Sequence, residues 1–218
     1  MKKNIIVSPS VLACDFAYAA DSIKKVEEAG AEYLHLDVMD GAFVPNLSFG
    51  PDFIKALRPH SKAVFDTHLM IMDPIRYVDK FIDAGSDMVT IHIESCDNVR
   101  ETLERIKEKG AKCGIVIKPK TPVSAIEPYL PMIDMLLIMS VEPGFGGQSF
   151  MPESLDRIRE AKALIDASGY DIDIEIDGGV KESNVAAIID AGANVIVAGS
   201  AVFLAPDPAA AVKALKGE

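Results

Sequence analysis

The sequence predicts an α/β fold made of eight strand–helix units, a (β/α)8 or TIM barrel. Short apolar segments alternate with longer amphipathic segments along all 218 residues. The apolar segments are nearly continuous, which is typical of parallel strands covered by helices on both faces. Four of the amphipathic segments end at a glycine, which can adopt the positive φ that stops a helix; these glycines are Gly30, Gly85, Gly110 and Gly192. Eight such regular units favour the barrel over a doubly wound open sheet.

The strands are predicted where the apolar runs lie. In order along the chain, they are expected near 5–9, 33–38, 63–68, 87–92, 113–117, 134–140, 172–176 and 195–198. The first run, Ile5-Ile6-Val7, is too short for a signal peptide, so it is assigned to a strand.

A helix is expected after each strand, because the intervening segments place apolar residues at helical spacing. In order, these helices are expected near 17–29, 51–58, 74–84, 97–109, 122–128, 153–167, 182–190 and 207–216. The longest connections, 39–50 and 141–152, follow the second and sixth strands, at the end where barrels keep their active sites. No linker divides the chain, so we expect one domain over 1–218.

Composition narrows the classes of partner. The net charge of −11 and the lack of a basic run argue against nucleic acid as a partner. No apolar run approaches the ~20 residues of a membrane span. Three cysteines without a Cys-x-x-Cys motif indicate a reduced, cytoplasmic protein. An anionic substrate would have to be held by local donors such as backbone N–H groups.

Four ionisable residues lie at the ends of three predicted strands: His35, Asp37, His68 and Asp177. Burying such groups costs several kcal/mol unless they are paired or bound to a metal. The carboxyl ends of barrel strands converge on one mouth, so residues far apart in the sequence can meet there. Two imidazoles and two carboxylates make a ligand set for a divalent transition metal. The alternative is that each residue is a separately hydrogen-bonded polar group.

Other polar residues of these strands are expected in supporting roles. Asp173 and Glu175 share the parity of Asp177, so we expect them to point inward and to hydrogen-bond to the ligands. Asp66 and His92 are interpreted as structural, because they lie deeper or on a strand without a ligand.

Glycine-bearing turns follow the sixth, seventh and eighth predicted strands, around Gly144, Gly146 and Gly147, around Gly178 and Gly179, and at Gly199. Glycine lets the backbone approach a ligand closely, and phosphate sites of barrels commonly use the last two of these loops. Three methionines, Met39, Met70 and Met139, have the parity or position to line the mouth, although filling the core is an equally good interpretation.

The chain resembles the ribulose-phosphate 3-epimerase family over essentially its whole length. The resemblance rests on these motifs, in order: Ser8-Pro9-Ser10-Val11-Leu12, His35-Leu36-Asp37-Val38-Met39-Asp40-Gly41-Ala42-Phe43-Val44-Pro45-Asn46, His68-Leu69-Met70, Pro143-Gly144-Phe145-Gly146-Gly147-Gln148 and Asp177-Gly178-Gly179-Val180. It implies a barrel of the ribulose-phosphate binding type. It also implies an isomerase that interconverts D-ribulose 5-phosphate and D-xylulose 5-phosphate in the pentose phosphate pathway with a divalent metal, zinc first, with iron, manganese or cobalt as alternatives.

The resemblance also implies roles for single residues. His35, Asp37, His68 and Asp177 would bind the metal, and Asp37 and Asp177 would be the acid/base pair. The residues expected to bind the substrate are Ser10, His68, Gly144, Phe145, Gly146, Gly147, Asp177, Gly178, Gly179, Gly199 and Ser200. Met39, Met70 and Met139 match the family's methionine lining. Lys118 and Glu142, which are asparagine in some relatives, are expected to form an ion pair, and the protein is expected to be a homo-oligomer.

Three other functions stay open on the sequence. One is 3-epimerisation of another ketose phosphate, such as D-allulose 6-phosphate. A second is a Schiff-base aldolase that uses Lys118, a lysine at a strand end, which would leave the metal ligands unexplained. A third is a non-catalytic sugar-phosphate binding barrel, which would not require two acid/base carboxylates.

Overall fold

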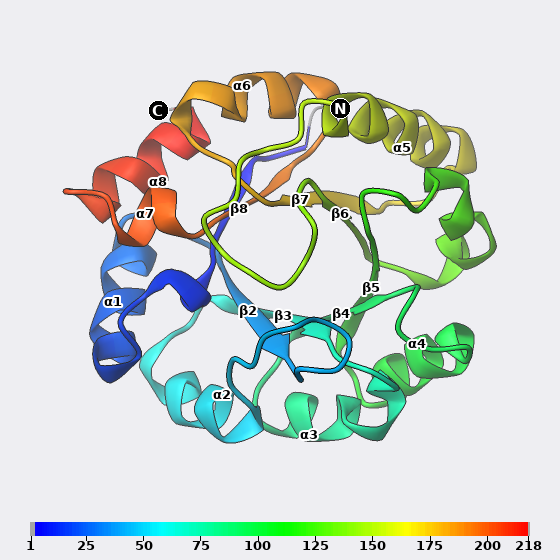
Figure 1. Ribbon diagram of the computed structural model, residues 1–218, viewed down its shortest axis with the longest axis horizontal. Helices are drawn as coiled ribbons and strands as arrows, with labels where there is room; N and C mark the ends of the chain where they lie inside the picture. Colours follow the sequence, from blue (N-terminus) through cyan, green and yellow to red (C-terminus); the bar gives the residue numbers. More distant parts are fainter. Residues whose placement is uncertain (1–2, 218) are drawn as a thin grey trace.

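Eight parallel strands form the inner wall of the protein, and helices surround it (Figure 1). The structure is a computed structural model that describes residues 3–217, so residues 1, 2 and 218 of the predicted domain lie outside the described part. The strands are β1 (Ile6–Pro9), β2 (Tyr33–Met39), β3 (Val64–Met70), β4 (Met88–His92), β5 (Lys112–Ile117), β6 (Met135–Met139), β7 (Asp173–Asp177) and β8 (Val195–Ala198). Their order is β1-β8-β7-β6-β5-β4-β3-β2, and a Ser10–His35 bridge brings β1 to β2. The predicted barrel is confirmed.

The helices lie outside the sheet, as predicted. The α-helices are α1 (Ala19–Glu28), α2 (Pro51–Leu57), α3 (Val78–Asp83), α4 (Val99–Glu108), α5 (Ser154–Ser168), α6 (Glu182–Ala191), α7 (Ser200–Phe203) and α8 (Pro208–Lys216). Short 3-10 helices are η1 (Val11–Ala13), η2 (Phe16–Tyr18), η3 (Arg58–His60) and η4 (Pro74–Arg76).

The segment predicted as a helix at 122–128 differs from the expectation. It is a 3-10 helix, η5, that runs over Val123–Met132 and contains Pro128 and Pro131. Proline has no N–H to donate and clashes with the preceding turn of an α-helix, so the segment cannot take up regular α-helical bonding. The short α7 after β8 was not predicted.

Alternate residues of each strand face the barrel interior. Tyr33, Met88, Met135 and Val195 form an apolar layer that is separate from the main core between sheet and helices. Above it, buried polar side chains replace apolar ones, and the register pairs Asp37 of β2 with His68 of β3. The polar groups are therefore concentrated toward the carboxyl ends of the strands.

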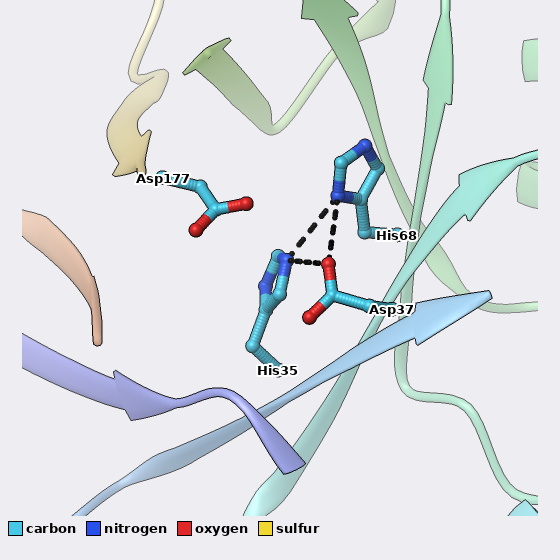
Figure 2. Close-up of side chains that lie close together, drawn as sticks. All are labelled: His35, Asp37, His68 and Asp177. Atoms are coloured by element: carbon cyan, nitrogen blue, oxygen red, sulfur yellow. Dashed lines mark hydrogen bonds and ion pairs between the residues drawn. The ribbon is translucent and has the colours of Figure 1, made fainter. Parts of the chain in front are cut away.

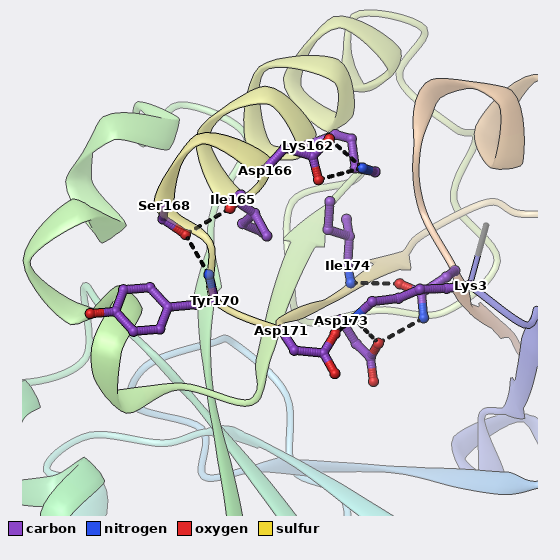
Figure 3. Close-up of polar contacts among 10 residues, drawn as sticks. Lys3, Lys162, Ile165, Asp166, Ser168, Tyr170, Asp171, Asp173 and Ile174 are labelled. Atoms are coloured by element: carbon purple, nitrogen blue, oxygen red, sulfur yellow. Dashed lines mark hydrogen bonds and ion pairs between the residues drawn. The ribbon is translucent and has the colours of Figure 1, made fainter. Parts of the chain in front are cut away.

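Asp173 is the first residue of β7 and therefore lies at the amino-terminal end of the barrel, opposite Asp177, and Figure 3 shows it beside Lys3. Its Oδ1 accepts hydrogen bonds from Lys3 Nζ at 2.7 Å and from Asn194 Nδ2 at 2.9 Å. Lys3 also pairs with Asp171 at 2.7 Å. Asp173 therefore joins the N-terminal segment to β7 and β8, and the expectation that it supports the metal ligands is wrong. Strand parity fixes the face of a residue but not its depth along the barrel axis.

Among residues 3–217, no helix has both the length and the apolar character needed to cross a membrane.

Candidate active site at the mouth of the barrel

The four predicted metal ligands come together at the carboxyl ends of β2, β3 and β7 (Figure 2). Each offers one ligand atom, and all four of these atoms lie within 4.8 Å of one another. His35 and His68 are fully buried, Asp37 is nearly so, and Asp177 is partly exposed.

The spacing of these atoms suits a small cation. His35 Nε2 lies 3.3 Å from His68 Nδ1, and Asp37 Oδ1 lies 3.4 Å from each of the two nitrogens. In a tetrahedral zinc site with bonds of ~2.0–2.1 Å, neighbouring ligand atoms lie roughly 3.3–3.4 Å apart. The three closest donors therefore fit the edges of such a tetrahedron, and Asp177 faces them from the far side (Figure 2).

Carboxylates behind His35 orient its ring. His35 Nδ1 lies 2.7 Å from Asp66 Oδ2 and 3.5 Å from Glu175 Oε1. An Nδ1–H donated to Asp66 leaves the Nε2 lone pair free to bind a metal. Glu175 is fully buried, and that burial together with Asp66 raises its pKa well above the usual range. Glu175 is buried beside His35, as its expected inward position requires, but neither of its carboxylate oxygens has a hydrogen-bond partner within residues 3–217, so the expected hydrogen bond to a ligand is wrong. Asp66 supports His35 directly.

A different set of residues contacts His68 on the side away from the cluster. His68 Nε2 lies 2.9 Å from His92 Nε2, and His92 Nδ1 lies 3.1 Å from Glu94 Oε2. Burial, with some help from His68, lowers the pKa of His92 to about 3. His92 therefore contacts a ligand directly, which the sequence analysis did not anticipate, and Glu94 was missed altogether.

The pKa values of the two aspartates of the cluster are shifted in opposite directions. Burial alone would raise the pKa of Asp37, but His35 and then His68 hold it well below the usual range. Ser10 Oγ also donates to Asp37 Oδ2 at 2.6 Å. Burial and the neighbouring Asp37 raise the pKa of Asp177 to about 6. Two carboxyl groups whose pKa values are pushed apart are suited to act as base and acid.

A cavity of about 470 Å³ opens above the cluster. Its lining includes every residue predicted for substrate binding, lining or catalysis except His68, which is fully buried, as is the predicted metal ligand His35. The lining also includes Asn46, which the sequence analysis left without a role. Asn46 Nδ2 donates to the carbonyl of Gly144 at 2.9 Å, so it joins the loop after β2 to the loop after β6.

The glycine turns line one end of this cavity. Gly178 and Gly179 have φ of +123° and +65°, and a Cβ on Gly178 would lie 2.7 Å from Val141. No hydrogen bond within residues 3–217 uses the backbone N–H of these loop residues: Gly146, Gly147, Gly178, Gly179 and Ser200. Free N–H groups at three neighbouring strand ends can hold an anionic group in an acidic protein.

Lys118 meets neither expectation drawn from the sequence, the ion pair with Glu142 or the role of an aldolase nucleophile. Its Nζ lies 3.8 Å from the centre of the Phe43 ring, and no ion pair with Glu142 is present within residues 3–217. It does not line the cavity. The predicted Lys118–Glu142 ion pair is therefore wrong. A Schiff-base aldolase mechanism would need Lys118 in the cavity as its nucleophile, and Lys118 does not lie there.

Glu94 gives a prediction for stability against pH. Burial would raise the pKa of Glu94, but hydrogen bonds from His92, Thr121 and the Lys118 N–H lower it from 4.5 to about 2. A carboxyl group with a depressed folded pKa stabilises the fold above its unfolded pKa, and this stabilisation is lost as pH falls. Glu94→Gln should therefore be less stable than the wild type at pH 6 and converge with it between pH 4.5 and 2. Urea unfolding of the chelated proteins measures this; a stability difference that is independent of pH would contradict it.

Comparisons with known proteins agree with this geometry. The sequence model described as "Ribulose-phosphate 3 epimerase family" matches residues 6–203. A curated ribulose-phosphate 3-epimerase of Synechocystis sp. is 49% identical over 99% of this chain and 95% of the relative. One from Bacillus subtilis is 45% identical over 98% of this chain and 99% of the relative. Among solved structures, a 3-hexulose-6-phosphate synthase from Salmonella typhimurium has a TM-score of 0.73 at 20% identity, covering 98% of this chain and 97% of that chain. At that identity it shows the fold alone.

Proposed function

This chain belongs to the ribulose-phosphate 3-epimerase family, and we propose from this that it interconverts D-ribulose 5-phosphate and D-xylulose 5-phosphate by epimerisation at C3. The observation that carries the proposal is the pair Asp37 and Asp177. They come from β2 and β7, face one cavity, and differ in proton affinity. We place this reaction in the pentose phosphate pathway of the cytoplasm.

Epimerisation requires that the C3 proton leave from one face and return to the other. A substrate lying between the two aspartates would present one face of C3 to each of them. The carboxylate that starts unprotonated takes the C3 proton, and the other carboxyl group supplies a proton to the opposite face of the planar enediolate. Ser10, which donates to Asp37 Oδ2, holds that carboxylate in place.

His35, Asp37, His68 and Asp177 would hold a divalent metal, zinc in first place, with Fe²⁺, Mn²⁺ or Co²⁺ as alternatives. Such an ion would supply Lewis-acid stabilisation of the negative charge that develops on the enediolate. Asp37 and Asp66 raise the pKa of His35 despite its burial; a cation would take the place of that proton.

The phosphate would bind at the other end of the cavity, on the free backbone N–H groups of the loops after β6, β7 and β8. This anchors the sugar so that C3 lies between the aspartates, which is an orientation effect. Met39, Met70 and Met139 are buried and also line the cavity, so they would give the reacting carbons an apolar wall.

A coupled assay tests the proposal directly. Purified protein, analysed for bound metal, is supplied with D-ribulose 5-phosphate and, separately, with D-allulose 6-phosphate. We expect turnover of the pentulose phosphate that stops when a chelator removes the metal. Preferred turnover of the hexulose phosphate would assign the alternative substrate, and phosphate binding without turnover of either would favour a non-catalytic barrel.

Gly147 tests the phosphate site. Its φ is +76°, and a Cβ there would meet open space in the cavity lining. Gly147→Val should raise KM for the phosphorylated sugar about tenfold, because the side chain hinders close approach to the backbone N–H groups.

Gly169 provides a matched control, because its φ is +75°, its Cβ would also meet open space, and it ends α5 away from the cavity. Gly169→Val should therefore carry the same backbone strain without the change in KM. Equal KM values in the two variants would make the effect of Gly147 structural only.

A further inference from the structure

We propose that Glu94 and His92 are positioning residues that fix the tautomer of His68, so that its Nδ1 lone pair faces the metal. The inference rests on the metal ligation by His68 proposed above. The Glu94 carboxylate would act on the metal site through His92, a second imidazole that does not itself bind the metal.

Glu94, at the end of this series of hydrogen bonds that lies away from the metal site, sets the direction of each bond. Glu94 Oε1 accepts from the backbone N–H of Lys118 at 2.9 Å and from Thr121 Oγ1. A backbone N–H can only donate, so this oxygen must accept. The other carboxylate oxygen, Oε2, faces His92 Nδ1 at 3.1 Å, and an ionised carboxylate has only lone pairs to offer. His92 must therefore carry its proton on Nδ1.

The tautomer of His68 follows. With its proton on Nδ1, a neutral His92 presents only a lone pair at Nε2. The contact of 2.9 Å between the two Nε2 atoms then requires that His68 donate, so His68 carries its proton on Nε2. This leaves the His68 Nδ1 lone pair directed at the side where His35 Nε2 and Asp37 Oδ1 lie.

The surroundings hold His92 in place. Both imidazoles are fully buried, so water does not compete for their nitrogens. The Phe43 ring lies 4.7 Å from the His92 ring, and Lys118 Nζ covers Phe43 from the loop after β5. His35 has its carboxylate, Asp66, in direct contact, whereas the carboxylate of His68 lies one imidazole away.

Glu94→Gln distinguishes positioning from packing, because it preserves shape and reverses one donor. The glutamine oxygen must still face the Lys118 N–H, so its amide N–H would face His92 Nδ1. His92 Nδ1 would then have to accept, its proton would move to Nε2, and Nε2 of His68 would have to accept as well. The proton of His68 would end on Nδ1, where it blocks the metal.

Nitrogen-15 NMR of metal-free protein at neutral pH reads these tautomers. The chain has only four histidines, and the exposed His60 serves as an internal reference. In the wild type we expect an Nδ1–H signal for His92 and an Nε2–H signal for His68. In Glu94→Gln both should reverse, and the Kd for Zn²⁺ from chelator competition should rise about 10–100-fold. Glu142→Gln, the same change at an exposed loop position after β6, should alter neither.

An Nδ1–H tautomer of His68 in the wild type would overturn the inference, and this measurement needs no variant to fold. Wild-type tautomers and Zn²⁺ affinity in a folded Glu94→Gln protein would overturn it too. Failure of the proposed epimerase function would instead appear as a wild-type protein without turnover, whatever the tautomers are.

Discussion

Asp177→Asn should lower the rate of epimerisation by about 10²–10⁴-fold, the usual contribution of a general acid or base. The variant should nevertheless still exchange the C3 hydrogen of one epimer with solvent deuterium. Asp37 remains able to remove and return a proton on its own face, while delivery to the opposite face lacks its carboxyl group. Asp37→Asn should show the reverse preference, exchanging only the other epimer. Mass spectrometry of each sugar phosphate after incubation in D2O measures both.

Two controls make this experiment decisive. Metal content must be matched between variants, because both aspartates are proposed ligands. Asp173→Asn lies on the same strand and face as Asp177 but at the other end of the barrel, and it should epimerise at the wild-type rate. Equal exchange of both epimers by one metal-replete variant would contradict the two-face scheme and indicate a single mobile base.

His68→Ala should fold and lose its metal. The change removes one of four ligands from a site whose binding geometry needs all of them, and it leaves His35 and Asp37 without a partner on one edge. We expect less than stoichiometric zinc after dialysis, and epimerase activity reduced to near background. Because an ion that binds only the folded state stabilises it, zinc should also raise the Tm of the wild type but not of the variant.

His60→Ala is the matched control, since His60 is exposed at the end of η3, away from the cluster. It should retain metal, activity and the zinc-dependent rise in Tm. Stoichiometric metal retained by dialysed His68→Ala would mean that His68 is not a ligand.

The sequence predicts the barrel and the cluster of His35, Asp37, His68 and Asp177 because both follow from strand periodicity. Each parallel strand is marked by its own apolar run, and the two-residue period fixes which side chains face inward. Depth is not encoded in this way, which is why Asp173 was assigned to the wrong end of the barrel. The α-helix predicted after β5 was wrong for a local reason. Apolar spacing alone suggested it, but Pro128 and Pro131 exclude α-helical hydrogen bonding there.

The residues around the cluster were harder to predict, since their contacts depend on strand stagger and on loop paths. His92 of β4 contacts His68 of the adjacent strand β3. Glu94 reaches His92 only because the chain turns back after β4. Asn46 and Gly144 are 98 positions apart and meet only because two loops meet over the mouth. A polar residue just past a strand end, such as Glu94, was the available signal.

The distribution of the ligands along the chain has a consequence for biosynthesis. His35, Asp37 and His68 all lie within the first third of the chain, whereas Asp177 follows about 110 residues after His68. At ~5–20 residues per second, roughly 5–20 s of translation separate the third ligand from the fourth. Closing the barrel requires β8, which pairs with β1 across nearly the entire sequence. A nascent chain therefore carries three ligands and two unpaired strand edges well before Asp177 and β8 have been made, so we expect stable metal loading only after β7 and β8 are available.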